Sequence, residues 1–178
     1  MDRNWLTLFQ EQQGQNQLDH VLKLNQKTEK YGLVLTKDEA KLILRERGNA
    51  LAKERRVEFG KGITEKLIYE FCDSDFICQD NYTDTIIRLQ EIFYMYKNEM
   101  MDELSDDELL HLMREQFEKI CFGDLDYLEG TCLNLFSQAV RAGYRGYKAS
   151  DGRGEAGRFD ETVRWDYGLY MEALRELF

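Results

Sequence analysis

The sequence predicts a mainly α-helical protein: a compact helical domain of about six to seven helices. Three observations support this fold class. None of the 178 residues is proline, the residue that most strongly interrupts a helix. Apolar residues make up 43% of the chain and charged residues 33%, a balance typical of globular proteins that bury a core. Apolar residues also recur at intervals of three and four, which is the period of a helix with one buried face.

The first thirty residues contain two apolar groups, separated by Gly14. They are Trp5, Leu6, Leu8 and Phe9, and then Leu18, Val21, Leu22 and Leu24. This spacing predicts one or two N-terminal helices with a boundary near Gly14. Two short apolar runs follow later, residues 33–35 and residues 57–59, and we expect that they could pair as a minor two-stranded β-ribbon packed on helices.

A helix is expected between these two runs, over about residues 37–55. Thr36 and Glu39 have the spacing of a capping box, in which the threonine hydroxyl accepts a hydrogen bond from one free backbone amide and the glutamate accepts from another. Acidic residues occupy the first turn and basic residues the last turn, an arrangement that stabilises the helix dipole.

Further helices are predicted downstream from the apolar spacing and from residues that begin and end helices. Ser105 and Glu108 form a second capping box, Asp124 is a helix-capping residue, and Gly123 and Gly143 suit helix ends. The predicted helices are residues 64–71, 80–100, 105–123 and 124–143. The second of them is the most hydrophobic, so we expect it at the centre of the core.

The glycine content then divides the chain. Five glycines lie between residues 143 and 158, which is the composition of a linker. The sequence therefore predicts a helical core domain (1–142), a glycine-rich linker (143–158) and a C-terminal amphipathic helix (159–178). The apolar residues of this last helix need a groove, either on its own core or on a second copy of the chain.

The net charge of −10 is distributed unevenly. Residues 99–129 contain eleven acids and two bases, a local charge of −9, whereas residues 37–56 contain seven bases and four acids, a local charge of +3. An acidic surface of this size repels phosphate backbones, so we expect no nucleic-acid partner. The acids form either a solvated surface or an interaction surface for a basic protein partner. The candidate interaction residues are Asp102, Glu103, Asp106, Asp107 and Glu108.

The sequence also predicts a cytoplasmic protein. The N-terminal residues include several glutamines in place of the apolar stretch of a signal peptide, and no window has the about 20 apolar residues of a membrane span. The polar side of the C-terminal helix is net acidic, which disfavours a membrane partner. We expect the four cysteines to be reduced thiols buried in the helical core. They are Cys72, Cys78, Cys121 and Cys132.

Four stretches of the sequence are similar to a known family: YGLVLT (31–36), RVEFGKGI (56–63), KLIYEFCDS (66–74) and LSDDEL (104–109). Together they resemble an uncharacterised bacterial family catalogued as a domain of unknown function, and the resemblance covers about residues 15–140. It implies a small bacterial cytoplasmic protein. It implies no activity, so no functional residue can be carried over from the family.

Two pairs of acids suggest an alternative function. Glu70 and Asp73 are three residues apart at the end of one predicted helix, as are Glu99 and Asp102 at the end of another. Such pairs can hold Mg²⁺ between two helices, and the arrangement is similar to that of all-helical nucleotide pyrophosphatases, whose first pair is Glu-x-x-Glu. The alternative is therefore a Mg²⁺-dependent all-helical phosphohydrolase that acts on a nucleotide-like substrate.

Other chemical motifs are incomplete. Glu108 and His111 form one Glu-x-x-His, but a di-iron site needs two, and Gln17 stands at the corresponding position before His20. A phosphate-binding loop at residues 60–62 lacks a required glycine. The cysteines and the two histidines form no nucleophilic set. Our leading hypothesis is therefore a non-catalytic protein–protein interaction module that needs no cofactor and binds another protein or a second copy of itself.

Overall fold

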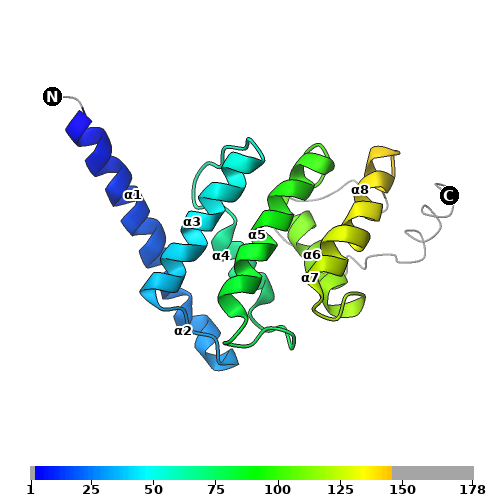
Figure 1. Cartoon of the computed structure of the whole chain (residues 1–178), viewed down its shortest axis with the longest axis horizontal. Coiled ribbons are helices and arrows are strands. Elements are labelled where there is room, and N and C mark those ends of the chain that lie inside the picture. The colour runs from blue at the N-terminus through cyan, green and yellow to red at the C-terminus, as the bar shows by residue number, and fades with distance from the viewer. Residues whose placement is uncertain (1–2, 146–178) are drawn as a thin grey trace, which may run out of the picture. The chain divides into compact units, whose positions relative to one another are not determined.

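A computed structural model describes residues 3–145 of the chain (Figure 1). These residues contain helices and no strand, so the prediction of a mainly helical fold is confirmed. Most of the predicted linker, residues 143–158, and the whole predicted helix 159–178 lie outside the described residues. The elements are α1 (Arg3–Lys23), α2 (Asn25–Thr28), the 3-10 turn η1 (Glu29–Tyr31), α3 (Lys37–Lys53), α4 (Thr64–Phe71), α5 (Tyr82–Glu99), α6 (Asp106–Lys119), α7 (Leu125–Tyr127), the π-helical turn η2 (Leu128–Cys132) and α8 (Leu133–Arg141).

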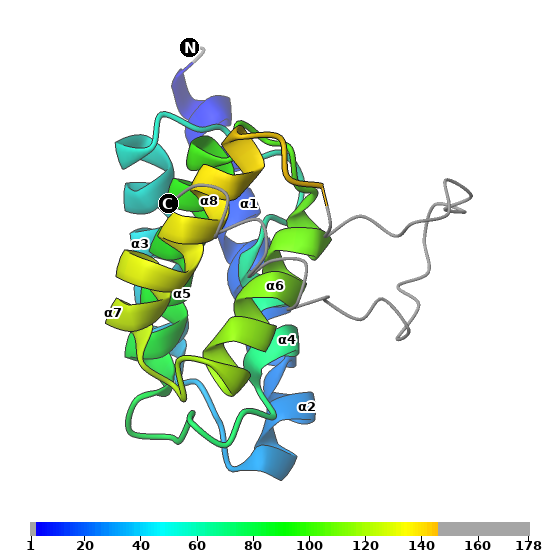
Figure 2. The same cartoon turned by 90° about the vertical axis from the view of Figure 1, so that its right-hand side faces the viewer.

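The chain divides into two compact units, unit 1 (Met1–Met95) and unit 2 (Tyr96–Phe178). In unit 1, α1 packs against α2, α3 and α4, and α3 also packs against α4. In unit 2, α7, η2 and α8 follow one another without a break as one helical run over residues 125–141 (Figure 2), and η2 packs against α6. The boundary falls inside α5, so this helix contributes residues to both units.

Apolar side chains fill the interior of each unit. α5 supplies several of the most completely buried ones, in line with its hydrophobic sequence. Buried residues of unit 1 include Leu33, Ile43, Leu67, Ile68, Phe71, Tyr82, Ile86, Leu89 and Phe93. Buried residues of unit 2 include Leu109, Met113, Phe117, Leu128, Leu133, Phe136 and Val140. The spacing of three and four that predicted the helices is therefore the spacing of their buried faces.

α1 is a single helix of 21 residues that continues through Gly14. The predicted boundary near Gly14 is therefore wrong. The helix is exposed at this position, and a Cβ added at Gly14 would meet nothing within 4 Å, so no neighbouring group forces the chain to turn. A glycine in a helix costs about 1 kcal/mol relative to alanine, which good helix formers on both sides can offset.

The β-ribbon predicted between residues 33–35 and residues 57–59 is not formed, because neither run is a strand. The first run is extended, but its backbone groups have other partners. The side-chain amides of Asn25 and Gln79 bond the N–H and C=O groups of its last two residues at 2.8–2.9 Å. The hydrogen bonds that a second strand would make are therefore already made by side chains.

Three predicted helix starts are confirmed. Thr36 and Ser105 are the N-caps of α3 and α6, and each forms a complete capping box with the glutamate three residues later. Asp124 caps α7, where its carboxylate accepts a hydrogen bond from the backbone N–H of Tyr127 at 2.9 Å. These caps satisfy backbone donors that the start of a helix leaves free, which is why they can be read from short sequence patterns.

Replacing Glu39 with glutamine is expected to destabilise the fold at neutral pH but not at low pH. The backbone N–H and the hydroxyl of Thr36 donate hydrogen bonds to the Glu39 carboxylate at 2.7 and 2.8 Å, and these bonds lower the pKa of Glu39. A carboxyl group whose pKa is lowered by folding stabilises the folded state above its unfolded pKa. This contribution is lost as the pH falls through the folded pKa.

For this partly exposed group we expect the Glu39→Gln change to lower the free energy of unfolding by about 0.5 kcal/mol at neutral pH. Urea denaturation at a series of pH values measures the difference from the wild type. Asp38→Asn is the control, since Asp38 lies in the same first turn but takes no part in the capping box. An equal pH dependence in both variants would contradict the interpretation.

Candidate functional site

The four carboxylates predicted to bind Mg²⁺ belong to different units, Glu70 and Asp73 to unit 1 and Glu99 and Asp102 to unit 2. In unit 2, Glu99 lies 3.3 Å from the guanidinium of Arg141, so this carboxylate already has a basic partner. Within residues 3–145, no three His, Cys, Asp or Glu side chains gather into a group that could hold a metal ion. A magnesium site at these four residues remains a prediction.

A buried lysine organises the predicted interaction surface of unit 2. We call this surface the acidic segment, and its residues are Asp102, Glu103, Asp106, Asp107 and Glu108. The ammonium group of Lys97 donates a hydrogen bond to the backbone C=O of Leu104 at 2.6 Å. It also lies 3.1 Å from the carboxylate of Asp106 and 3.6 Å from that of Asp102. A single buried cation therefore holds the turn between α5 and α6 and fixes two of the five acids.

Two further acids of the acidic segment also have partners inside unit 2. The Glu103 carboxylate lies 3.6 Å from the guanidinium of Arg145. Glu108 accepts a hydrogen bond from the backbone N–H of Ser105 at 2.7 Å, as the second half of the capping box. At least four of the five acids therefore have partners within unit 2, and their binding to a basic protein partner remains a prediction.

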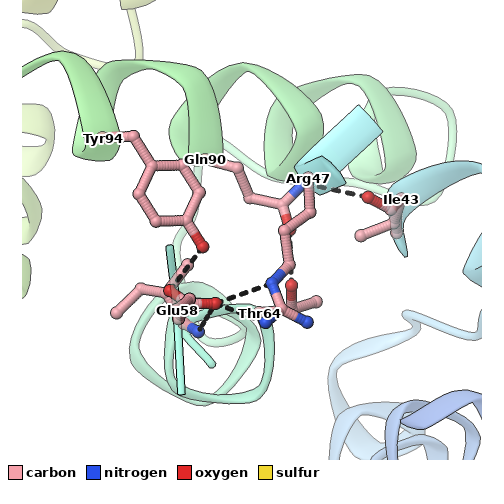
Figure 3. Close-up of polar contacts among 7 residues, drawn as sticks. Ile43, Arg47, Glu58, Thr64, Gln90 and Tyr94 are labelled. Carbon is pink, nitrogen blue, oxygen red and sulfur yellow. Dashed lines mark hydrogen bonds and ion pairs between the residues drawn. The ribbon is translucent and has the colours of Figure 1, made fainter. Parts of the chain in front are cut away.

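Unit 1 contains a buried polar cluster that sequence reasoning missed. Its central contact joins Arg47 on α3, which is only 6% exposed, to Glu58 in the loop before α4. The Nε and Nη2 atoms of Arg47 lie 2.7 and 2.5 Å from Oε1 of Glu58. The hydroxyl of Tyr94 on α5 donates a hydrogen bond to the other carboxylate oxygen at 2.6 Å (Figure 3). Both oxygens of the Glu58 carboxylate, whose side chain is 14% exposed, are therefore paired.

A second set of hydrogen bonds extends the cluster. The Thr64 hydroxyl donates to Oε1 of Gln90 at 2.5 Å, and Nε2 of Gln90 donates to the backbone C=O of Ile43 at 3.2 Å (Figure 3). These side chains connect α3, α4 and α5. Each of these polar groups has a hydrogen-bond partner. The network therefore links the three helices without the free-energy cost of burying an unpaired polar group.

The electrostatics of the cluster favour a structural role. Burial, and then the hydrogen bond to Glu58, raise the pKa of Tyr94, so its phenol keeps its proton and stays a donor. The charge of Arg47 is neutralised by Glu58 at contact distance. Every charged or titratable group of the cluster is occupied by another member. The cluster therefore connects the loop before α4 to α3 and α5.

The same contact determines what the loop exposes. Glu58 points inward, and its two neighbours in the chain, Val57 and Phe59, are 76% and 89% exposed. Gly62 closes the loop with a left-handed backbone, at a φ of 74°. A Cβ at this position would collide with the side chains of Glu58 and Arg47, so the close approach requires glycine.

α1 carries a group of exposed apolar side chains on the surface of unit 1. We call it the α1 stripe, and its residues are Trp5, Leu6, Leu8 and Phe9. These side chains are 48–58% exposed, and Figure 1 shows the first turns of α1 diverging from α3. At about 100° per residue they share an arc of about 160° around the helix. The residues by which α1 enters the core, Leu18 and Val21, lie on roughly the opposite side.

The predicted environment of the cysteines is correct for three of the four. Cys72, Cys121 and Cys132 are buried and form no disulfide with one another or with Cys78, which is exposed. Cys78 lies in the segment between α4 and α5, where its backbone N–H donates to the Asn81 side chain at 2.9 Å. The apolar neighbours that suggested burial belong to a loop, so the prediction for Cys78 is wrong.

Over residues 3–145, the fold and these sites define a helical protein whose buried polar cluster and acidic segment both contain internal ion pairs. The chain belongs to a family of unknown function (DUF6323), whose sequence profile matches residues 20–146. This match confirms the resemblance noted over residues 15–140. No curated protein and no solved structure matches the chain. In the part of the chain described, no helix has both the length and the apolar character needed to cross a membrane.

Proposed function

We propose that the protein is a non-catalytic interaction module that associates through the first half of α1 with the same segment of a second copy. The observation that carries this proposal is the position of the α1 stripe. Its four apolar side chains lie away from the side of α1 that packs on unit 1 at Leu18 and Val21. Removing them from water therefore requires a surface from outside unit 1.

The distribution of charge along the chain favours a second copy as the partner that covers the α1 stripe. Each chain has a net charge of −10, so two copies repel one another over most of their surfaces. Residues 4–18 contain a single charged residue, Glu11, and residues 4–16 are all exposed. Two copies can therefore meet here with little electrostatic penalty. A two-fold pair uses the same surface on both copies, so an apolar, charge-poor helix is its own complement.

The size of the stripe indicates a reversible association. At about half exposure, each of its side chains presents roughly 100 Å², so a pair of stripes buries roughly 800 Å². This is less than the roughly 1,200–2,000 Å² of stable complexes. Apolar burial at about 25 cal/mol per Å² exceeds the entropic cost of association by a small margin. We expect a dissociation constant in about the micromolar range.

A Leu8→Glu variant is expected to stay monomeric at concentrations where the wild type forms dimers. The change removes two leucines from each dimer and places two carboxylates in an apolar contact, so the dissociation constant should rise about a hundredfold or more. Sedimentation equilibrium of the full chain measures this constant. Added salt is expected to strengthen the wild-type dimer, because salt screens the repulsion between two acidic chains.

Thr7→Glu is the matched control. It adds the same charge one residue earlier, at an exposed position on the opposite side of α1 from the stripe. This variant should dimerise almost as the wild type does. A wild type that stays monomeric at every concentration, or equal effects of the two variants, would contradict the proposal. Binding to neutral lipid vesicles that Leu8→Glu abolishes would assign the stripe to a membrane surface, against the second copy.

The acidic segment supports the same class of function with a different partner, a basic protein. The ion pairs of Lys97 with Asp102 and Asp106 support this second mode of binding. They hold two of the carboxylates in place, so little side-chain entropy is lost when a partner binds. Salt separates the two modes, because binding of a basic partner weakens with salt whereas pairing through the stripe strengthens. The proposal places this module in the bacterial cytoplasm, in line with the bacterial family that the sequence resembles.

A further inference from the structure

Two buried cysteines of unit 2 lie in direct contact. The Sγ atoms of Cys121 and Cys132 are 3.4 Å apart, and the two residues are 5% and 6% exposed. Cys121 follows the end of α6, and Cys132 is the last residue of the π-helical turn η2. Contact between two thiols from different elements is the arrangement from which a disulfide can form without rearranging the fold.

We propose that Cys121 and Cys132 are a peroxide-reactive thiol pair that closes reversibly to an intramolecular disulfide. The oxidant is a small hydroperoxide such as hydrogen peroxide. Its size suits the site, because residues as little exposed as Cys121 and Cys132 are more accessible to a small molecule than to a protein oxidant. The reductant that reopens the pair is a low-molecular-weight thiol, which attacks the disulfide by thiol exchange.

The hydrogen bond between the sulfurs gives the two cysteines different roles. The hydrogen bond between the two sulfurs lowers the pKa of the Cys132 thiol and raises that of the Cys121 thiol, whose burial raises it further. The thiolate is the nucleophilic form of cysteine. We expect Cys132 to attack the peroxide and Cys121 to resolve the product, and the serine variants described below test this order.

The reaction balances in two steps. The Cys132 thiolate attacks one peroxide oxygen and the O–O bond breaks, so Cys132 becomes a sulfenic acid and the other oxygen leaves as water after taking a proton. The Cys121 sulfur then attacks the Cys132 sulfur, the S–O bond breaks, and a second water leaves. The proton of the Cys121 thiol leaves with the sulfenic hydroxyl as the second water. Two thiols and one hydrogen peroxide thus give one disulfide and two waters, and the peroxide is reduced by two electrons.

The local backbone suits this closure. The sulfurs must approach from 3.4 Å to about 2.05 Å, a movement within the reach of side-chain rotation and small backbone shifts. Cys121 lies in an irregular turn whose next residue, Phe122, has a left-handed backbone at a φ of 48°. Cys132 lies in a π-helical turn, a rare local conformation that often occurs at functional sites.

The cysteines of the other unit provide an internal control. Trypsin cuts after lysine and arginine, so it releases residues 120–141 with Cys121 and Cys132, and residues 67–88 with the other two cysteines. The Cys72 thiol donates to the Tyr69 carbonyl at 3.4 Å, whereas Cys78 is exposed. Oxidation of the two peptides can therefore be compared: one contains two cysteines whose sulfurs are in contact, and the other contains one buried and one exposed cysteine.

The experiment treats the folded full chain with hydrogen peroxide, alkylates the remaining thiols, and analyses the tryptic peptides by mass spectrometry. We expect the 120–141 peptide to lose two hydrogen atoms and both alkylation sites, about tenfold faster than thiols are lost from the 67–88 peptide. A reducing thiol should restore both sites. Equal rates in the two peptides, or oxidation of 120–141 only to sulfinic acid, would overturn the proposal.

Serine variants test the assigned roles. In Cys121→Ser, the sulfenic acid of Cys132 cannot be resolved and should be trapped by a cyclic dione reagent. In Cys132→Ser, Cys121 should keep its alkylation site under the same treatment. Thermal melting of the reduced variants checks that each still folds. Equal dione trapping at Cys121 and Cys132 in the two variants would overturn the assignment of Cys132 as the attacking residue.

Discussion

Replacing Arg47 with methionine is expected to lower the free energy of unfolding by about 3–5 kcal/mol. The change leaves the Glu58 carboxylate in the interior of unit 1 without its cation, and breaking one side of a buried ion pair has a cost of this size. Methionine keeps most of the side-chain volume and a similar helix propensity, so the loss reports mainly on the charge. Urea denaturation followed by circular dichroism measures it.

Arg45→Met is the matched control, two residues earlier on α3. The Arg45 side chain is 69% exposed and its ion pair with Glu46 faces water, so the variant should lose at most about 0.5 kcal/mol. Adding Glu58→Gln to Arg47→Met removes the second charge and should restore part of the stability. Equal losses at Arg45 and Arg47 would show that the buried polar cluster does not hold unit 1 together.

Replacing Gly62 with alanine is expected to have the second largest effect, about 3 kcal/mol or more. The left-handed backbone at this position costs about 1–2 kcal/mol for any residue with a Cβ. The new methyl group would also collide with the carboxylate of Glu58 and the guanidinium of Arg47. Because these groups are bonded to each other, neither can move aside without lengthening the ion pair.

Gly60→Ala separates the two causes of this loss. Gly60 has almost the same backbone, with a φ of 78°, but a Cβ there would meet nothing within 4 Å. This variant should lose only the conformational part, about 1 kcal/mol. Thermal melting of the two variants provides the comparison. If Gly60→Ala and Gly62→Ala have the same melting temperature, the collision with the ion pair contributes nothing to the loss of stability in Gly62→Ala.

Local sequence patterns were sufficient for features whose causes lie within a few residues. The capping boxes at Thr36 and Ser105 and the cap at Asp124 were predicted because donor and acceptor are three residues apart. The prediction of a helix over residues 64–71 matches α4, which has a strongly one-sided apolar pattern. In each case the local preference and the final packing agree.

The buried polar cluster was missed because its members are distant in the sequence. Arg47 and Glu58 are 11 residues apart, and Glu58 and Tyr94 are 36 apart. One signal was present: Arg47 stands four residues after Ile43 and three before Ala50, both buried, so it lies on the buried side of α3. A charged residue on an apolar helix face predicts a buried partner without identifying it.

The other differences between the sequence-based predictions and the structure also arise from contacts between residues that are distant in the sequence. Nothing local distinguishes an extended run that pairs with a strand from one whose backbone is bonded by the side chains of Asn25 and Gln79. Composition located the acidic segment but not its dependence on Lys97. The contact between Cys121 and Cys132 depends on how α6 and η2 pack, which their separate apolar patterns do not specify.

The exposure of the first half of α1 has a consequence for how that half forms. Residues 4–16 gain little from tertiary packing, and an isolated helix of about this length is marginal in water because nucleation is costly. Contacts with a second copy would supply the missing stabilisation, so helix formation and pairing become one coupled equilibrium. If two copies pair in this way, the fraction of chains in which residues 4–16 are helical would rise with the fraction of dimer. Helix content in this segment would therefore increase with the concentration of the protein.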